Sequence, residues 1–65
     1  MNDFQFDTLV AYLAEKGCKF IVKTDYLNNM KRSIMCLHLS KVGKFYRADN
    51  KIISKGYAAL LVRAM

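Results

Sequence analysis

Apolar residues recur at helical spacing near the start of the chain. In residues 4–16 they fall on one face of a helix of about 3.6 residues per turn, at Phe6, Leu9, Val10 and Leu13. Asn2 or Asp3 can cap the first turn, and Lys16 followed by Gly17 is typical of a helix end. The pattern predicts a helix over residues 4–16.

A second helix is predicted near the other end of the chain. Residues 55–64 carry an apolar stripe at the same spacing, at Tyr57, Ala58, Leu61 and Ala64. Ser54 stands directly before this stripe, and its hydroxyl can accept a hydrogen bond from a free amide of the first helical turn. We therefore expect a helix that begins at Lys55 and ends at Ala64.

Between the two helices, side chains alternate as they do in strands. The first predicted strand, residues 18–24, has one face of Cys18, Phe20 and Val22 and another of Lys19, Ile21 and Lys23. Asn28 and Asn29 predict a turn, because asparagine tolerates positive φ. The second predicted strand, residues 33–39, directs Met35, Leu37 and Leu39 to the core and Ile34, Cys36 and His38 away from it.

Two further turns bound the third predicted strand. Residues 41–44 turn the chain, residues 45–48 form the strand, and Asp49-Asn50 marks the next turn. Residues 51–53 either extend this strand or return beside it. The predicted order is α-β-β-β-α, a single α+β domain over residues 1–65 with a three-stranded antiparallel sheet and two helices on one face. Its expected core is Phe20, Val22, Met35, Leu37, Leu39 and Phe45.

Charge is distributed unevenly along the chain. Eleven Lys and Arg residues oppose five acids, and three of those acids precede the first base, Lys16. Residues 1–15 therefore sum to −3 and residues 16–65 to +9. Dispersed bases favour a polyanion, because each phosphate that they neutralise releases counterions. We expect RNA as the partner, bound through its phosphate backbone.

The candidate RNA-binding residues lie on the predicted outer sheet face, at the hairpin ends and at the start of the second helix. They are Lys19, Lys23, Lys31, Arg32, Lys41, Lys44, Tyr46, Arg47, Lys51, Ser54 and Lys55. Lys51, Ser54 and Lys55 surround a helix start, where free amides and the helix dipole favour an anion.

The predicted outer sheet face has two possible uses. It combines bases with apolar and aromatic side chains: Lys19, Ile21, Lys23, Ile34, Cys36, His38, Lys44 and Tyr46. Single-stranded bases can stack on such a face while their phosphates meet lysines, or a second copy can cover it. Because 54% of these 65 residues are hydrophobic, more than a small core buries, we expect a homodimer.

The sequence disfavours an enzyme. His38 is the one side chain that ordinarily titrates near neutral pH, and no paired carboxylates, phosphate loop or Ser-His-Asp set accompany it. Cys18, Cys36 and His38 are too few for a zinc site, and two reduced cysteines fit a cytoplasmic protein. No apolar run approaches the roughly 20 residues that cross a bilayer. We expect no cofactor, metal, small-molecule substrate or membrane contact.

The predicted element order resembles the double-stranded RNA-binding domain. That family runs from its third strand into its second helix through a Ser-Lys-Lys-x-Ala-like stretch, which residues 54–61 resemble as Ser-Lys-Gly-Tyr-Ala-Ala-Leu-Leu. Gly56 replaces the second Lys, and Ala59 replaces the Lys that usually follows the Ala. The Gly-Pro-x-His signature of the first loop is replaced by Asn28, Asn29, Lys31 and Arg32. The resemblance implies an RNA-binding fold.

A second resemblance is to the HicA-type toxin ribonucleases, which share this topology. Residues 13–22, Leu-Ala-Glu-Lys-Gly-Cys-Lys-Phe-Ile-Val, resemble their helix–Gly–strand opening. Their catalytic His lies in a Gly-Ser-His stretch at the start of the second strand, where this chain has Lys31-Arg32-Ser33. The only histidine here is His38, five residues further on. This resemblance implies a ribonuclease that lacks its catalytic signature.

These features predict a small, basic, non-enzymatic RNA-binding protein that acts as an adaptor or inhibitor. Proteins of this size and charge are common in phages and mobile elements, where one role is to block an RNA-cleaving toxin of the host through its RNA. Two alternatives stay open. One is a HicA-like toxin ribonuclease, and the other is a protein-interaction module that binds an acidic partner surface.

Overall fold

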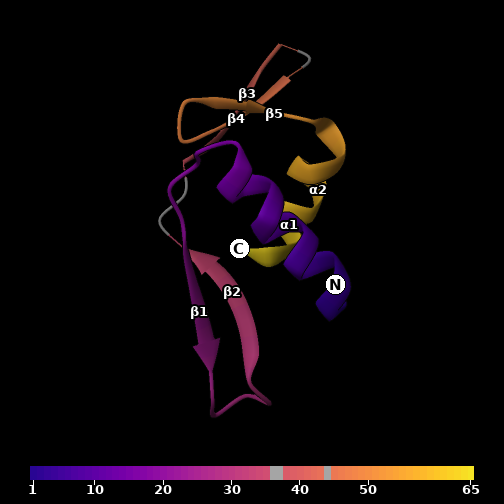
Figure 1. Ribbon diagram of the computed structural model, residues 1–65, viewed down its shortest axis with the longest axis vertical. Helices are drawn as coiled ribbons and strands as arrows, with labels where there is room; N and C mark the ends of the chain where they lie inside the picture. Colours follow the sequence, from indigo (N-terminus) through magenta and orange to yellow (C-terminus); the bar gives the residue numbers. More distant parts are fainter. Residues whose placement is uncertain (36–37, 44) are drawn as a thin grey trace.

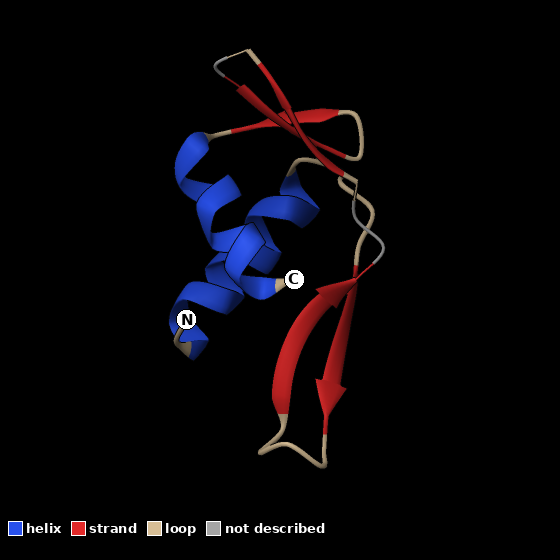
Figure 2. Cartoon of the chain, turned by 180° about the vertical axis from the view of Figure 1, so that it is seen from behind, coloured by secondary structure: helices blue, strands red, loops and turns tan. Residues whose placement is uncertain are grey.

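A computed structural model describes residues 1–35, 38–43 and 45–65 of the chain. Within these residues the elements are α1 (Asp3–Glu15), β1 (Ile21–Asp25), β2 (Lys31–Met35), β3 (Leu39–Val42), β4 (Phe45–Ala48), β5 (Lys51–Ile53) and α2 (Lys55–Ala64). The helices occupy the middle of the molecule, with β3–β4–β5 across one end and β1–β2 extending to the other (Figures 1 and 2). The predicted α+β class is confirmed.

The expectation of one three-stranded sheet is wrong, because the strands form a pair and a separate triplet. The predicted strand over residues 33–39 divides between the two sheets, ending as β2 at Met35 and resuming as β3 at Leu39. Each observed pairing, β1–β2, β3–β4 and β4–β5, joins strands that are consecutive in the sequence. Such pairings close short loops and therefore lose less chain entropy than a sheet assembled from distant strands.

Two tight turns build the three-stranded sheet. Gly43 follows β3 with φ +61°, which glycine adopts without strain. Asp49 and Asn50 have φ values of 48° and 64°, as a two-residue type I′ hairpin turn requires, and Ala48 pairs with Lys51 across it. Residues 51–53 therefore return beside β4 as β5, and the turn predicted at Asp49-Asn50 is confirmed.

Helix α1 begins and ends one residue earlier than the predicted 4–16, and its two ends carry the caps that the local signals predict. The Asn2 side chain accepts a hydrogen bond from Gln5 N at 2.8 Å, and Gln5 Oε1 accepts one from Asn2 N at 3.3 Å, which forms a capping box. At the other end Gly17 N donates to Ala14 O and Cys18 N to Leu13 O, with Gly17 at φ +76°. These two bonds form a Schellman motif, which ends the helix and directs the chain toward the sheet.

Helix α2 also begins and ends as predicted. Ser54 caps it by accepting a hydrogen bond from Tyr57 N at 3.4 Å, and the helix runs over Lys55–Ala64. Ala58, Leu61 and Ala64 are buried and Tyr57 is half-buried, so the predicted apolar stripe is confirmed.

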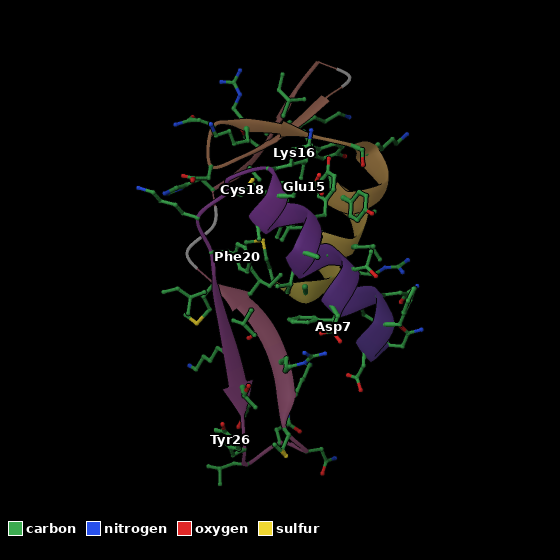
Figure 3. All side chains as sticks on the ribbon, viewed as in Figure 1. Asp7, Glu15, Lys16, Cys18, Phe20 and Tyr26 are labelled. Atoms are coloured by element: carbon green, nitrogen blue, oxygen red, sulfur yellow. The ribbon has the colours of Figure 1, made fainter. Side chains whose placement is uncertain are left out.

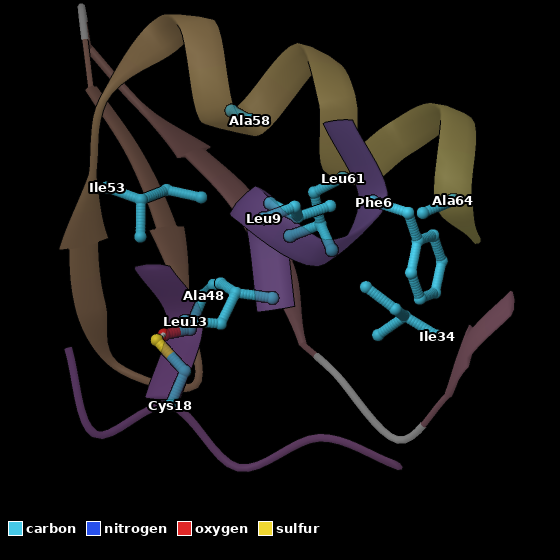
Figure 4. Close-up of a cluster of buried hydrophobic side chains, with 10 residues drawn as sticks. All are labelled: Phe6, Leu9, Leu13, Cys18, Ile34, Ala48, Ile53, Ala58, Leu61 and Ala64. Carbon is cyan, nitrogen blue, oxygen red and sulfur yellow. Dashed lines mark hydrogen bonds between the residues drawn. The ribbon is translucent and has the colours of Figure 1, made fainter. Parts of the chain in front are cut away.

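Among the described residues, ten buried side chains form one core (Figure 4). They are Phe6, Leu9, Leu13, Cys18, Ile34, Ala48, Ile53, Ala58, Leu61 and Ala64. Of the six expected core residues, Phe20 and Leu39 are half-buried against it, whereas Val22 and Met35 are exposed. Leu37 and the side chain of Phe45 lie outside what the structure describes. The core is mainly helical because only one face of each small sheet reaches the helices.

The predicted orientation of the second strand is wrong at two positions. Ile34 is buried and Met35 exposed, the reverse of the expectation. The loop between β1 and β2 pairs Asp25 with Lys31, so Val22 lies opposite Ile34 and shares its face. The sequence predicts the alternation within each strand but not which residues pair between strands. A difference of one residue in that register exchanges the two faces of the partner strand.

Strands β1 and β2 with their turn form an arm, residues 21–35, that extends beyond the helices (Figure 1). Asn29 and Met30 have φ values of 52° and 57°, so the turn expected at Asn28-Asn29 is present. The arm gives the molecule a long axis of 38 Å against 19 Å in the other two directions. It contacts the helices through β2, which packs against α2.

Candidate nucleic-acid interface

Helix α1 ends and α2 begins at the same end of the molecule, beside the three-stranded sheet (Figure 1). The Ser54 amide donates to the Tyr12 hydroxyl oxygen at 3.2 Å. The Tyr12 and Tyr57 rings stack with centroids 3.7 Å apart and planes 2° from parallel. These contacts hold the capped start of α2 against the last turns of α1.

The segment after α1 is tied to the same place. Cys18 Sγ lies 3.6 Å from the carbonyl oxygen of Ala48, and the Lys19 amide donates to the Asp49 carboxylate at 2.9 Å. A methyl group added at Gly17 would lie 4.0 Å from Lys51 Cε. The turn between β4 and β5, the end of α1 and the start of α2 therefore meet.

Four lysines and the capping serine gather at this meeting point, and we call them the basic junction: Lys16, Lys19, Lys51, Ser54 and Lys55. All five residues are exposed. Lys16 Nζ lies 5.7 Å from the centroid of the Tyr12 ring, a cation–π distance. Figure 3 shows Lys16 beside Glu15 and Cys18, where the end of α1 meets the sheet. Sequence reasoning missed Lys16 as a site residue, because it read this lysine only as a helix end.

The three-stranded sheet adds two further bases. Arg47 pairs with Ser40 on one side and Ile52 on the other, and all three are exposed, so this row faces away from the helices. Lys41 is also exposed and pairs with Tyr46. Tyr46 is half-buried and packs against the core, so its ring is largely covered. Lys41 therefore lies on the face of Tyr46, opposite to that of Arg47, so the sheet offers a polyanion one base on each face and little aromatic surface from Tyr46.

Arg32 is held by acids of α1 instead. Its guanidinium lies 2.9 Å from Asp7 Oδ1 and 3.2 Å from Asp3 Oδ1, and it stacks over the Phe6 ring at 4.3 Å. The hydrogen bond to Asp7 is the main cause that raises the pKa of Arg32 above its ordinary value. Arg32 thus fastens the arm to α1, while its contact with RNA stays a prediction.

Within the part of the chain that the structure describes, both ion pairs belong to Arg32. Two of the five acids, Asp3 and Asp7, form these ion pairs, and the Asp49 carboxylate accepts a hydrogen bond from the Lys19 amide. Asp25 accepts a hydrogen bond from Leu27 N at 3.1 Å in the arm turn. The lysines of the basic junction therefore keep their charge available to a ligand, with Glu15 and Asp49 as the nearest acids in sequence.

The expected site residues that the structure describes fall into three groups. Lys19, Lys51, Ser54 and Lys55 gather at the basic junction, and Lys41, Tyr46 and Arg47 belong to the adjacent sheet. Lys23, Lys31 and Arg32 lie on the arm.

The expectation of a continuous outer face is wrong, because its members fall on two sheets and Ile34 is buried. Lys44 and Cys36 lie outside the described residues. His38 is exposed, and its carbonyl oxygen accepts a hydrogen bond from Asp49 N at 3.0 Å.

Comparison with known proteins found no match, whether with family models, curated proteins or solved structures. The two family resemblances therefore remain predictions. Among the described residues, no cluster of three or more His, Cys, Asp or Glu could hold a metal ion. Neither described helix is long and apolar enough to cross a membrane.

Cys18 reports on the integrity of the basic junction. Burial, and then the Asp49 carboxylate, raise the pKa of the Cys18 thiol above its ordinary value of 9.0, while Lys51 and Lys16 act in the opposite direction. The thiolate is the reactive form, so we expect iodoacetamide at pH 8 to modify Cys18 at least about tenfold more slowly in the folded protein than in urea. Mass spectrometry of the Cys18 peptide measures this rate separately from Cys36.

The same shift gives a pH dependence. Well below pH 9.0 the thiol is protonated in both states, and as the pH rises through 9.0 the unfolded chain loses its proton first, so folding stability decreases. Equal modification rates in the folded and unfolded protein would contradict the buried position of Cys18.

Proposed function

We propose that this protein is a small, non-enzymatic RNA-binding protein that holds phosphates at the basic junction and along the adjacent three-stranded sheet. The observation that carries the proposal is the set of exposed lysines gathered at one end of the molecule, outside the ion pairs found among the described residues. Exposed bases that are not already neutralised gain most from replacing the counterions of a phosphate backbone.

The start of α2 supports the same mode of binding. Its first turn contains no acid, and Lys55 is its first residue, where the positive end of the helix dipole opposes a lysine. A phosphate would compensate both the dipole and the neighbouring Lys51. Arg47 and Lys41, at opposite faces of the adjacent sheet, would then contact phosphates further along the RNA.

Binding without cleavage is the activity of an adaptor or inhibitor. Such a protein can cover an RNA and keep other proteins from it, and a phage-type inhibitor of an RNA-cleaving toxin is one form of this role. The ribonuclease alternative needs a proton-transfer partner for His38. The alternative of an acidic protein partner would use the same lysines, and the test below separates it from RNA.

The test is a salt titration of binding to a fluorescently labelled RNA of random sequence. We expect log Kd to rise linearly with log salt, with a slope of roughly 0.7 to 0.9 for each phosphate neutralised. RNA that co-purifies from cells not treated with nuclease would show the same contact in the native setting.

Two outcomes would oppose the proposal. Binding that is absent at about 50 mM salt, where phosphate contacts are strongest, would exclude an RNA-binding role and favour a protein partner. If the wild-type protein cleaves RNA and the His38→Ala variant does not, the protein is a ribonuclease and the proposal of binding alone is wrong.

A further inference from the structure

The arm exposes a concentration of large apolar side chains. Of the exposed large hydrophobics found among the described residues, six belong to the arm: Ile21, Val22, Tyr26, Leu27, Met30 and Met35. Tyr26 is 75% exposed and Leu27 fully exposed at the tip, which Figure 3 shows far from the helices. Exposed large apolar side chains concentrated in one segment of a small protein indicate an interface.

The arm also has a strand edge to which no other described strand is paired. Among residues 1–35, 38–43 and 45–65, β1 forms hydrogen-bonded pairs with β2 alone, and it lies on the side of β2 away from the helices (Figures 1 and 2). An edge strand presents a row of unpaired N–H and C=O groups that can accept a further strand. A two-stranded hairpin is only marginally stable, and additional strands stabilise it.

The residues of β1 are complementary to a second copy of themselves. A two-fold axis normal to the sheet pairs two antiparallel β1 strands so that opposite residues share a face, which leaves few centred registers. Centring on Lys23 sets lysine against lysine, and centring on Asp25 sets aspartate against aspartate.

Centring on Thr24 sets Lys23 of each copy opposite Asp25 of the other. Oppositely charged residues then meet twice across the axis, with Thr24 opposite Thr24. The same register brings Val22 alongside Tyr26 of the second copy and Ile21 alongside Leu27. The exposed apolar residues of the strand and of the tip thus cover one another.

We propose that two copies of this chain associate through their β1 edges, centred on Thr24, to form a continuous four-stranded sheet β2–β1–β1–β2. The order of charges along β1 favours a second copy of the same strand as the partner, because Lys23 of each copy then lies opposite Asp25 of the other. The interface lies on the arm and leaves the basic junction uncovered. It therefore does not depend on RNA binding, and it is tested without RNA.

Charge reversal gives the first test, read by sedimentation velocity at micromolar concentration. We expect the wild type at twice the 7.5 kDa chain mass. Lys23→Glu and Asp25→Lys should each raise the Kd of the dimer by about tenfold or more, because each places like charges opposite one another twice. An equimolar mixture of these two variants should form a heterodimer, since opposite charges then meet at both positions.

The controls separate this effect from damage to the fold. Lys41→Glu makes the same charge change on the other sheet and should leave the dimer intact. Asp25→Asn keeps a side-chain oxygen that can accept the hydrogen bond from the Leu27 amide, and it should weaken the dimer less than Asp25→Lys. A mixture that stays monomeric while both variants keep their far-ultraviolet spectra overturns the proposal.

A cross-link gives the second test and identifies the register. Opposite Cα atoms in an antiparallel pair lie about 4.5 to 5.5 Å apart, within the range of a disulfide. In a Cys36→Ser background, Thr24→Cys should therefore oxidise to a covalent dimer faster than Lys23→Cys or Lys41→Cys. Equal rates at Thr24→Cys and Lys41→Cys would refute pairing through β1, and fastest cross-linking at Lys23→Cys would refute the proposed register.

Discussion

Replacing both Lys51 and Lys55 with glutamate should weaken RNA binding by about 100-fold near 0.1 M salt. Each lysine is expected to neutralise about one phosphate at the basic junction, and each glutamate adds a repulsion. The slope of log Kd against log salt should fall by roughly 1.4 to 1.8 from the two lost contacts alone. The loss should be similar for all RNA sequences, because phosphate contacts do not read bases. Fluorescence anisotropy at several salt concentrations measures both quantities.

Arg63→Glu is the matched control for Lys55→Glu. Arg63 is exposed in the last turn of the same helix, about 12 Å along the axis from Lys55, and changing it alters the net charge equally. If the lysines act locally, Lys55→Glu weakens binding more than Arg63→Glu. Equal losses would mean that only the overall charge attracts RNA, and that the basic junction is not the contact surface.

Leu9→Ala should destabilise the folded protein strongly. Leu9 is fully buried between the helices, and removing such a side chain leaves a cavity that costs about 2 to 5 kcal/mol. A chain of 65 residues has a total stability of roughly 3 to 10 kcal/mol, so the loss is a large share of it. Thermal unfolding followed by circular dichroism should show a Tm lower by about 10 to 30 °C.

Val62→Ala is the comparison for this substitution. Val62 is 58% exposed on α2, so its truncation should change the stability by less than about 0.5 kcal/mol. A Leu9→Ala protein with the Tm of the wild type would show that the core is not the one in Figure 4.

The two proposed surfaces lie at opposite ends of a 38 Å molecule. Association through the arm would leave the basic junction of each copy exposed at its far end. Two phosphate-binding ends held by one rigid sheet would favour an RNA long enough to reach both, because the second contact becomes intramolecular. Arg32 matters for this arrangement, since its contacts with Asp3 and Asp7 join the arm to α1.

Both helices were predictable from residues that are close together in the sequence. The side chain of Asn2 meets Gln5, that of Ser54 meets Tyr57, and Gly17 ends α1, so each signal acts within one helical turn. The turn at Asp49-Asn50 follows the same logic, because its two positive φ values suit these two residue types. Local chemistry decides such features before any distant part of the chain is in place.

The register of the strands and the identity of the site depended on contacts between different elements of the folded chain. Alternation along residues 33–39 is compatible with either face inward, and only the pairing of Val22 with Ile34 chose between them. Lys16 belongs to the candidate site because the hydrogen bond between Tyr12 and Ser54, 42 residues apart in the sequence, holds the end of α1 beside the start of α2. Arg32 was tied to α1 by Asp3 and Asp7, although the sequence shows it only as a base beside Lys31. Register and ion pairing are properties of the folded chain, because they are set by which surfaces are brought together rather than by any one segment.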